Sequence, residues 1–315
     1  MKATRRSFIK HLGLAGIVAP MTGKAIDSFR FSQIDTPLDI HIFSKHLQFL
    51  DYREAAKAAA QIGFKGLDLT VRPRGHVLPE NVKENLPRAI KEIKQAGLSC
   101  DMITTAVDDA ADSLDMNVIE TAGAEGVTFY RSNWFRYDQK LPLEESIQLY
   151  QNRVKNLGIL NKKNNIIGCY QNHSGTGIGS SFWELKQILE SVDPAYFGIQ
   201  YDIRHAVAEG GQSWVNGLKL LRDHIKVIVL KDFIWKRVNG QWRIVNVPIG
   251  EGMVNFTSYF KLLKDYGLNP PACLHLEYPL GGADKGRSTL TNDPKLVFEA
   301  MKRDLETSQK LWLEA

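Results

Sequence analysis

Polar side chains gather at four places where a short apolar segment of the chain ends. These segments end in Gln171-Asn172-His173, in Asp202-Ile203-Arg204-His205, in Lys231-Asp232 and in Glu277. Carboxylates and imidazoles can move protons or bind metals, and a lysine can stabilise a developing negative charge. Each group alone has an ordinary explanation as a partner for a loop hydrogen bond. Their convergence on one rim would be typical of a functional site.

The segments that carry these residues alternate with amphipathic helices along the chain. We expect eight strands, at residues 38–43, 66–69, 98–105, 127–130, 166–171, 196–202, 225–230 and 272–277. Helices between strands favour parallel pairing with right-handed crossovers. An open doubly wound sheet is the alternative, but the glycine-rich loop that usually follows its first strand is missing. The pattern predicts an α/β fold, a single (β/α)8 barrel whose polar strand ends meet at the C-terminal mouth.

Local signals mark individual elements of this barrel. Asp51 is expected to cap a helix that ends at Gly63, and residues 294–313 should form the last helix. Residues 235–243 break the rhythm, because Asn239-Gly240 between alternating residues predicts a β-hairpin. This hairpin would form a small flap after strand seven, close to the mouth of the barrel.

The first 25 residues resemble a twin-arginine export leader. Arg5-Arg6 precede an apolar run at residues 12–19, which is too short for a membrane span of about 20 residues. Small residues around 23–25 would suit a signal peptidase. A disordered basic N-terminus is the alternative. We therefore expect a periplasmic protein whose mature barrel domain comprises residues 26–315.

The excess positive charge of the chain belongs to this leader. Of 40 basic and 35 acidic residues, five basic and no acidic residues lie in positions 1–25, which leaves 35 of each in the rest. A neutral domain lacks the charge expected for nucleic-acid binding. No later stretch is apolar enough to span a membrane. Cys100, Cys169 and Cys273 lie in separate expected strands, which argues against disulfides.

Several motifs together resemble the sugar phosphate isomerase/epimerase family of xylose isomerase-like barrels, which also contains the endonuclease IV branch. The resemblance covers nearly all of the chain after the leader. The motifs are the segment 63–69, Asp202-x-x-His205-Ala206, Lys231-Asp232, Pro248-Ile249-Gly250-Glu251-Gly252, Leu276-Glu277 and the segment 301–305. Each motif alone is weak, but their order and spacing along a barrel are fairly specific.

The resemblance implies one divalent metal, manganese, magnesium or zinc, bound by Glu, Asp, His and Glu at the ends of strands five to eight. Asp202 and Glu277 match this pattern, whereas Gln171 replaces the first glutamate and Val229 replaces the histidine. Glutamine is a weak ligand for a hard cation and valine is none. We therefore expect at most weak metal binding through Asp202, Glu277 and Gln171, with His205 or His173 nearby.

The resemblance also implies chemistry beside a sugar carbonyl. Family epimerases move a proton between the faces of a carbon with two opposed glutamates, and Gln171 cannot accept a proton. Isomerisation between an aldose and a ketose needs one base, as does elimination or hydration beside a ketone. Some family members act as lyases on 3-keto-glycosides, and an exported enzyme would meet glycosides more readily than sugar phosphates.

The expected roles follow from the resemblance. Glu277 would be the base, Lys231 would stabilise the enediolate and His205 would bind a substrate hydroxyl. The residues expected to bind the sugar or keto-glycoside are His173, Arg204, Trp235 and His76. His275, two residues before Glu277, is expected to be a hydrogen-bonded core residue. Trp134, Phe135 and Trp183 could stack on a sugar or anchor loops.

Two other classes of function remain as alternatives. A non-catalytic sugar-binding barrel would explain why two metal ligands are replaced, but not why the rim keeps so many charged groups. A nuclease of the endonuclease IV kind is disfavoured by the replaced ligands, the neutral charge and the export signal. An oligomer is compatible with all of these.

The leader generates a direct prediction. Replacing Arg5 and Arg6 by lysine should trap the protein in the cytoplasm, because the arginine pair is what distinguishes this leader from a basic N-terminus. Fractionation of cells that express the variant or the unaltered chain would measure this. Unchanged export of the variant would show that residues 1–25 are not such a leader.

Overall fold

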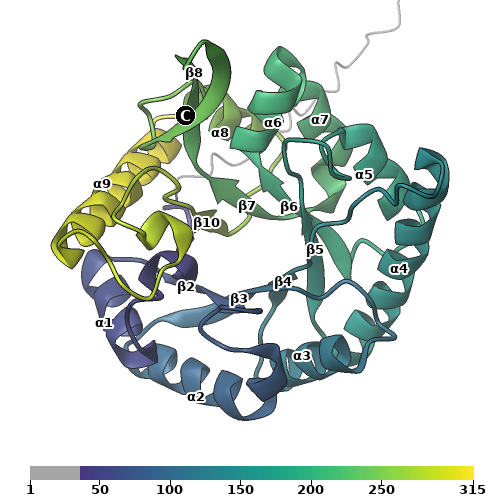
Figure 1. Ribbon diagram of the computed structural model, residues 1–315, viewed down its shortest axis with the longest axis horizontal. Coiled ribbons are helices and arrows are strands. Elements are labelled where there is room, and N and C mark those ends of the chain that lie inside the picture. The colour runs from purple at the N-terminus through teal and green to yellow at the C-terminus, as the bar shows by residue number, and fades with distance from the viewer. Residues whose placement is uncertain (1–35) are drawn as a thin grey trace, which may run out of the picture. The chain divides into compact units, whose positions relative to one another are not determined.

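The alternation of strands and helices produces a closed barrel (Figure 1). The computed structural model describes residues 36–315, so the predicted export signal lies outside the described residues. Within this range eight strands pair in parallel in the closed order β1-β10-β7-β6-β5-β4-β3-β2. They are β1 (Ile40–Phe43), β2 (Gly66–Val71), β3 (Ser99–Thr105), β4 (Phe129–Arg131), β5 (Ile167–Gln171), β6 (Phe197–Asp202), β7 (Ile225–Leu230) and β10 (Ala272–Leu274). The predicted (β/α)8 barrel is confirmed.

A ring of helices surrounds the strands (Figure 1). The α-helices of the described residues are α1 (Tyr52–Ile62), α2 (Val82–Gln95), α3 (Ser113–Ala124), α4 (Leu143–Asn164), α5 (Phe182–Leu189), α6 (Ile203–Gly210), α7 (Trp214–Leu221), α8 (Phe256–Asp265) and α9 (Pro294–Leu313). Asp51 caps α1 in a capping box with Glu54, and Gly63 ends it in a left-handed conformation, as expected. Across residues 36–315, every helix is too short or too polar to cross a membrane.

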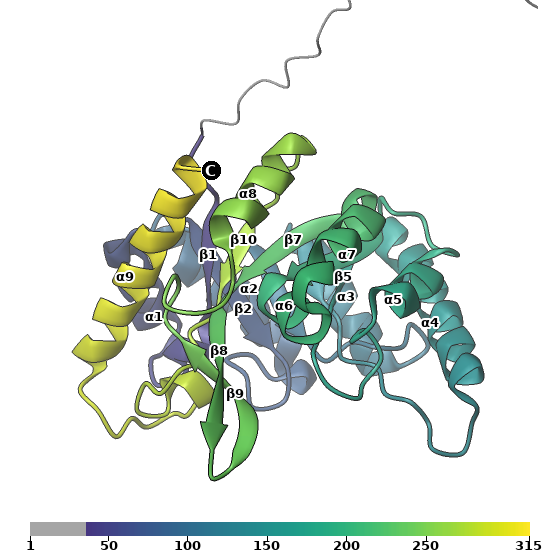
Figure 2. The ribbon, with the colours of Figure 1, turned by 90° about the horizontal axis from the view of Figure 1, so that it is seen from above.

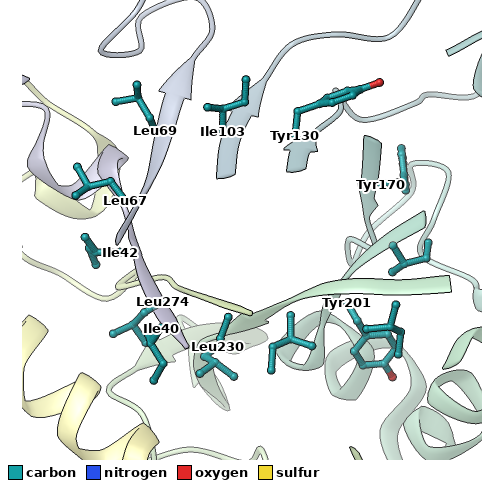
Figure 3. Close-up of a cluster of buried hydrophobic side chains, with 14 of the residues drawn as sticks. Ile40, Ile42, Leu67, Leu69, Ile103, Tyr130, Tyr170, Tyr201, Leu230 and Leu274 are labelled. Atoms are coloured by element: carbon teal, nitrogen blue, oxygen red, sulfur yellow. The ribbon is translucent and has the colours of Figure 1, made fainter. Parts of the chain in front are cut away.

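Alternate side chains of each strand face opposite sides of the barrel wall. Large apolar residues such as Ile42, Leu69 and Tyr201 point outward and fill the space under the helices (Figure 3). The inward-facing residues include a small apolar cluster of Met102, Cys169 and Val227 in the lumen. The three cysteines are buried and free. The outer layer and this cluster fix the strands, so that polar residues further along each strand face one another at the mouth.

Two elements near the mouth differ from the expectation. Strand β10 ends at Leu274 rather than at Glu277, because β7 leaves the barrel after Leu230. The N–H of His275 donates the last bond to the Leu230 carbonyl, at 3.0 Å. In addition, helix α6 starts directly after β6 and includes Ile203, Arg204 and His205, for which no helix was predicted. The Asp202 carboxylate caps α6 by accepting from the His205 N–H at 3.0 Å, a capping signal that the sequence reading missed.

The predicted flap is present and longer than expected. Strands β8 (Asp232–Val238) and β9 (Gln241–Val247) pair antiparallel over their whole length. Asn239 and Gly240 both have positive φ angles, 49° and 79°, as a two-residue hairpin turn requires. Figure 2 shows the hairpin projecting from the barrel.

Asp232 anchors the base of this flap. One carboxylate oxygen accepts from the backbone N–H groups of Phe233 and Val254, and the other accepts from those of Gly250 and Gly252, at 2.8–3.1 Å. A side chain at Gly252 would collide with this carboxylate, since an added Cβ would lie 2.2 Å from Asp232 Oδ1. The loop after the flap is therefore folded around the Asp232 carboxylate, and Asp232 directly follows Lys231 in the chain.

We expect Asp232→Asn to destabilise the protein by roughly 2–4 kcal/mol, because an amide nitrogen would face two N–H donors in place of an acceptor. Urea denaturation would measure the change in the free energy of unfolding. Asp265→Asn is the matched control, since Asp265 pairs only with Lys261 on the surface, where such pairs contribute little. Equal effects of the two substitutions would contradict the anchoring role of Asp232.

Candidate functional site

The polar ends of four neighbouring barrel strands meet in one cluster at the mouth. Gln171 and Asp202 end β5 and β6, Lys231 follows β7, and Glu277 follows β10. Gln171, Asp202 and Lys231 are buried, whereas about a quarter of the Glu277 side chain is exposed. The structure thus brings together the predicted base, the predicted cation and the predicted metal ligands.

Lys231 lies at the centre of this cluster. Its Nζ is 2.8 Å from His205 Nε2, 3.1 Å from Asp202 Oδ2 and 3.3 Å from Glu277 Oε2. An ammonium group has three N–H donors, so these three acceptors use all of them. With only 3% of the residue exposed, Lys231 depends on the two carboxylates for compensation of its buried charge.

Glu277 is held by two lysines rather than one. Its Oε1 accepts from Lys45 Nζ at 3.0 Å and its Oε2 faces Lys231. Burial by itself would raise the pKa of Glu277, but the ammonium groups of Lys231 and Lys45 outweigh burial and hold that pKa well below its usual range. The carboxylate is therefore ionised and also reachable from the solvent.

His205 is neutral in this environment. Burial, followed by the positive charges of Lys231 and Arg204, holds its pKa well below the ordinary value. Ser174 Oγ lies 2.8 Å from Nδ1 and Lys231 Nζ lies 2.8 Å from Nε2. Nδ1 also faces the Ser174 backbone N–H at 3.1 Å and Arg204 Nη1 at 2.8 Å, so N–H donors lie against both ring nitrogens and disfavour the protonated imidazolium.

Gln171 links two charged groups that would otherwise be apart. Its Oε1 accepts from Arg131 Nη1 at 3.2 Å, and its Nε2 donates to Asp202 Oδ2 at 2.7 Å. The guanidinium of Arg131 also lies 4.1 Å from the centre of the Trp134 ring. Both ends of the Gln171 amide are thus committed to protein partners.

Arg204 connects the cluster to the flap instead of facing a free cavity. Its Nε and Nη2 donate to Asn246 Oδ1 on β9, at 3.2 and 2.8 Å, and Asn246 Nδ2 donates to the Glu277 carbonyl at 3.2 Å. Arg204 is 7% exposed. The prediction that Arg204 binds substrate gains no support, because its guanidinium is occupied in positioning β9 against Glu277.

Aromatic rings border the cluster on one side. The His173 ring lies between Trp134 and His205, with centroid distances of 4.9 and 3.9 Å. Trp235 on β8 is 41% exposed, and its contact with a substrate stays a prediction. Phe135 is a buried loop anchor. Trp183 lines a pocket of about 470 Å³ that includes residues of α5 and α7, apart from the strand ends.

His76 joins loops rather than facing the mouth. Its Nδ1 lies 3.2 Å from both Ser44 Oγ and Thr70 Oγ1, and its Nε2 lies 3.3 Å from the Leu47 carbonyl. Burial lowers the pKa of His76 to about 4. With both ring nitrogens engaged, His76 has a structural role, and the expected substrate contact is not supported.

A second group of potential metal ligands lies in the lumen. Donor atoms of Asp68, Cys273 and His275 lie within 4.8 Å of one another, and all three residues are buried. The Asp68 carboxylate already accepts from the Thr104 hydroxyl at 2.9 Å and the Cys273 thiol at 3.0 Å. These residues could hold a metal only if those hydrogen bonds were exchanged for metal bonds.

His275 corrects one expectation. It was expected to be a hydrogen-bonded core residue, but neither ring nitrogen has a hydrogen-bond partner among residues 36–315. The ring instead stacks on Phe43 with centroids 4.3 Å apart, and its Nδ1 lies 3.8 Å from Glu277 Oε1, beyond hydrogen-bond distance. The strand periodicity placed His275 correctly on the face of Glu277 but could not show what surrounds it.

The residues predicted to bind a metal at the mouth do not fit a divalent cation in this arrangement. Gln171 turns its amide nitrogen toward Asp202, Val229 offers no donor atom, and Lys231 lies between Asp202 and Glu277. Hard cations need several oxygen ligands, and an adjacent ammonium group repels them. The expected weak metal binding stays a prediction. This geometry gives a physical reason why any such binding would be weak.

Three residues of the cluster were missed by sequence reasoning. Lys45 follows β1 and would have been found if the rule about strand ends had been applied to the first strand. Arg131 ends β4 and carried the same signal. Asn246 had no signal, because its contact with Arg204 depends on how the flap folds back over the mouth.

Comparison with known proteins agrees with this architecture. The sequence profile described as xylose isomerase-like TIM barrel matches residues 56–293, about three quarters of the chain. No curated protein matches the sequence.

Several solved structures share the fold at low sequence identity. A xylose isomerase-like TIM barrel protein from Mycobacterium smegmatis in complex with magnesium aligns over 87% of this chain and 98% of its own, with 14% identity and a TM-score of 0.64. The 3-keto-D-glucoside 4-epimerase of E. coli aligns over 86% and 99%, with 12% identity and a TM-score of 0.60. A probable 3-DHS dehydratase from Bacillus anthracis aligns over 84% and 98%, with 16% identity and a TM-score of 0.61.

The profile match covers well over half of the sequence, and these structures share the closed barrel at high coverage. This chain belongs to the xylose isomerase-like TIM barrel family.

Proposed function

We propose that the protein is a carbohydrate-active enzyme of the isomerase/epimerase kind, which removes a proton from a carbon beside a sugar carbonyl. The observation that carries the proposal is the pair of Glu277 and Lys231, whose Oε2 and Nζ lie 3.3 Å apart at the mouth of the barrel. A carboxylate can take the proton while an adjacent ammonium group stabilises the oxygen that gains charge. The family supports a sugar-like substrate.

In this proposal Glu277 is the base. The resting carboxylate is a weak base because Lys231 and Lys45 stabilise its charge. A substrate oxygen that replaces Glu277 Oε2 at Lys231 would remove one of these stabilising contacts and so strengthen the base. The same exchange would leave the ammonium group beside the developing enediolate. Neutral His173 would bind a substrate hydroxyl, and Trp235 would cover the sugar from the flap. The expected hydroxyl contact of His205 gains no support, because Ser174 and Lys231 engage its two ring nitrogens, so His205 would instead position Lys231.

One base limits the chemistry to a single face of the carbon. Gln171 cannot accept a proton, and its amide is committed to Arg131 and Asp202. Aldose–ketose isomerisation by one base satisfies this limit. A lyase is the second candidate, because it needs the same base and the same stabilised enolate. It would remove the C2 proton beside the C3 ketone of a 3-keto-glycoside, form the C1=C2 double bond and expel the aglycone from C1.

We also propose that the enzyme works in the periplasm, where glycosides rather than sugar phosphates would be available. This rests on the leader-like sequence around Arg5-Arg6. Because Asp202, Glu277 and Gln171 do not fit a divalent metal in this arrangement, no step proposed above depends on one.

The substitution Glu277→Gln should lower turnover of the ketosugar or 3-keto-glycoside substrate by about 10²–10⁴-fold, the usual contribution of a positioned base. Substrate binding should change little, since the amide keeps the shape of the side chain. Steady-state kinetics and calorimetric binding would measure the two effects. Glu306→Gln, an exposed carboxylate on α9, is the matched control and should leave turnover unchanged. A variant Glu277→Gln with full turnover would refute the assignment.

Deuterium exchange tests whether there is one base. In deuterated water, NMR of the recovered substrate should show exchange of the proton beside the carbonyl on one face only, without inversion. Exchange on both faces would reveal a second base and restore the two-base epimerase reaction. Measurable binding without exchange or turnover on any ketosugar or 3-keto-glycoside would favour the non-catalytic sugar-binding barrel instead.

A further inference from the structure

We propose that the ammonium group of Lys231 takes the position of a divalent cation at the mouth of this barrel, so that the site carries its cation on a side chain. The proposal concerns the construction of the site rather than the reaction. It can therefore be tested without a substrate, and it stands or fails independently of the proposed function. Three features carry it: the available ligands, the contacts of Lys231 and the surrounding charge.

The available ligands do not suffice for a divalent cation. Hard cations such as Mg²⁺ and Mn²⁺ prefer about six oxygen ligands, which commonly include several protein carboxylates. Gln171 presents an N–H donor to Asp202, at 2.7 Å. Val229 pairs with Asp202 on one side and Cys273 on the other, and its side chain is fully buried. The position between Asp202 and Cys273, where the family pattern has a histidine ligand, therefore carries an apolar side chain.

The contacts of Lys231 are those expected of a bound cation. Its ammonium group touches one imidazole nitrogen and two carboxylate oxygens, from His205, Asp202 and Glu277, at 2.8–3.3 Å. A metal ion on the same carboxylate oxygens would lie about 2.0–2.6 Å from each of them. It would then lie close to Nζ, where two positive charges repel strongly in a buried site. Metal and ammonium group therefore exclude each other.

The charge of the cluster matches a monovalent cation. Lys231 and Lys45 already balance the two carboxylates of Asp202 and Glu277. A glutamate at position 171 would place a further carboxylate near Asp202 Oδ2. Two neighbouring carboxylates repel each other, so a nearby cation of higher charge would be needed to keep both ionised. Gln171 removes that negative charge while its amide still bridges Arg131 and Asp202. The neutral residue at 171 and the single charge of Lys231 are thus complementary.

Titration of Mn²⁺ into metal-stripped protein tests the proposal, with the electron paramagnetic resonance signal of free Mn²⁺ and the Tm as readouts. Wild-type protein should bind no stoichiometric Mn²⁺ and show no Mn²⁺-dependent rise in Tm. Lys231→Ala should bind Mn²⁺ at least about tenfold more tightly than wild type, because the competing charge is gone. Its Tm should rise on addition of Mn²⁺.

Lys45→Ala is the matched control, since it removes an ammonium group from the same Glu277 carboxylate but leaves Lys231 in place. It should gain less Mn²⁺ affinity than Lys231→Ala does, because Lys231 still lies between Asp202 and Glu277. Lys231→Met keeps the aliphatic part of the side chain and repeats the test if Lys231→Ala fails to fold. The proposal is overturned if wild type binds stoichiometric Mn²⁺ that Asp202→Asn abolishes. It is also overturned if neither Lys231 variant binds Mn²⁺ more tightly than Lys45→Ala.

Discussion

At the mouth of this barrel, the carboxylates of Asp202 and Glu277 touch the same ammonium group, that of Lys231, and their burial makes a nearby positive charge necessary. Asp202 is fully buried and Glu277 is largely so. A buried carboxylate without a charged or hydrogen-bonded partner would cost free energy. Lys231 prevents this, and the arrangement of the surrounding residues follows from the need to hold its Nζ among these acceptors.

Several neighbouring contacts secure that position. Asp232, the next residue along the chain, binds four backbone N–H groups, so the backbone at Lys231 cannot shift without disturbing the loop after the flap. Asp202 also caps α6 through the His205 N–H, which orients the imidazole that Lys231 contacts. The flap is tied to the same cluster, because Asn246 bridges the guanidinium of Arg204 and the Glu277 carbonyl.

The polar and apolar inward-facing residues divide the barrel along its axis. An apolar cluster that includes Met102 and Val227 supports the lumen, and the charged rim follows further along the strands. Asp68, Cys273 and His275 form an intermediate polar group. Such a division separates the packed lumen from the solvent edge, where about a quarter of the Glu277 side chain is exposed. The exposed Trp235 on the flap lies outside this wall and is free to contact a ligand.

The sequence by itself determined the barrel, the flap and the four strand ends that carry most of the rim. Helix caps such as Asp51, the turn Asn239-Gly240 and the strand periodicity are local properties, and the C-terminal ends of parallel strands must meet at one edge. Only the tertiary structure decided what each rim residue does. The second lysine on Glu277, the bridging role of Gln171, the occupied guanidinium of Arg204 and the stacking of His275 on Phe43 depend on contacts between segments far apart in sequence. Those contacts are set by side-chain distances of a few ångströms, which no pattern along a single chain specifies.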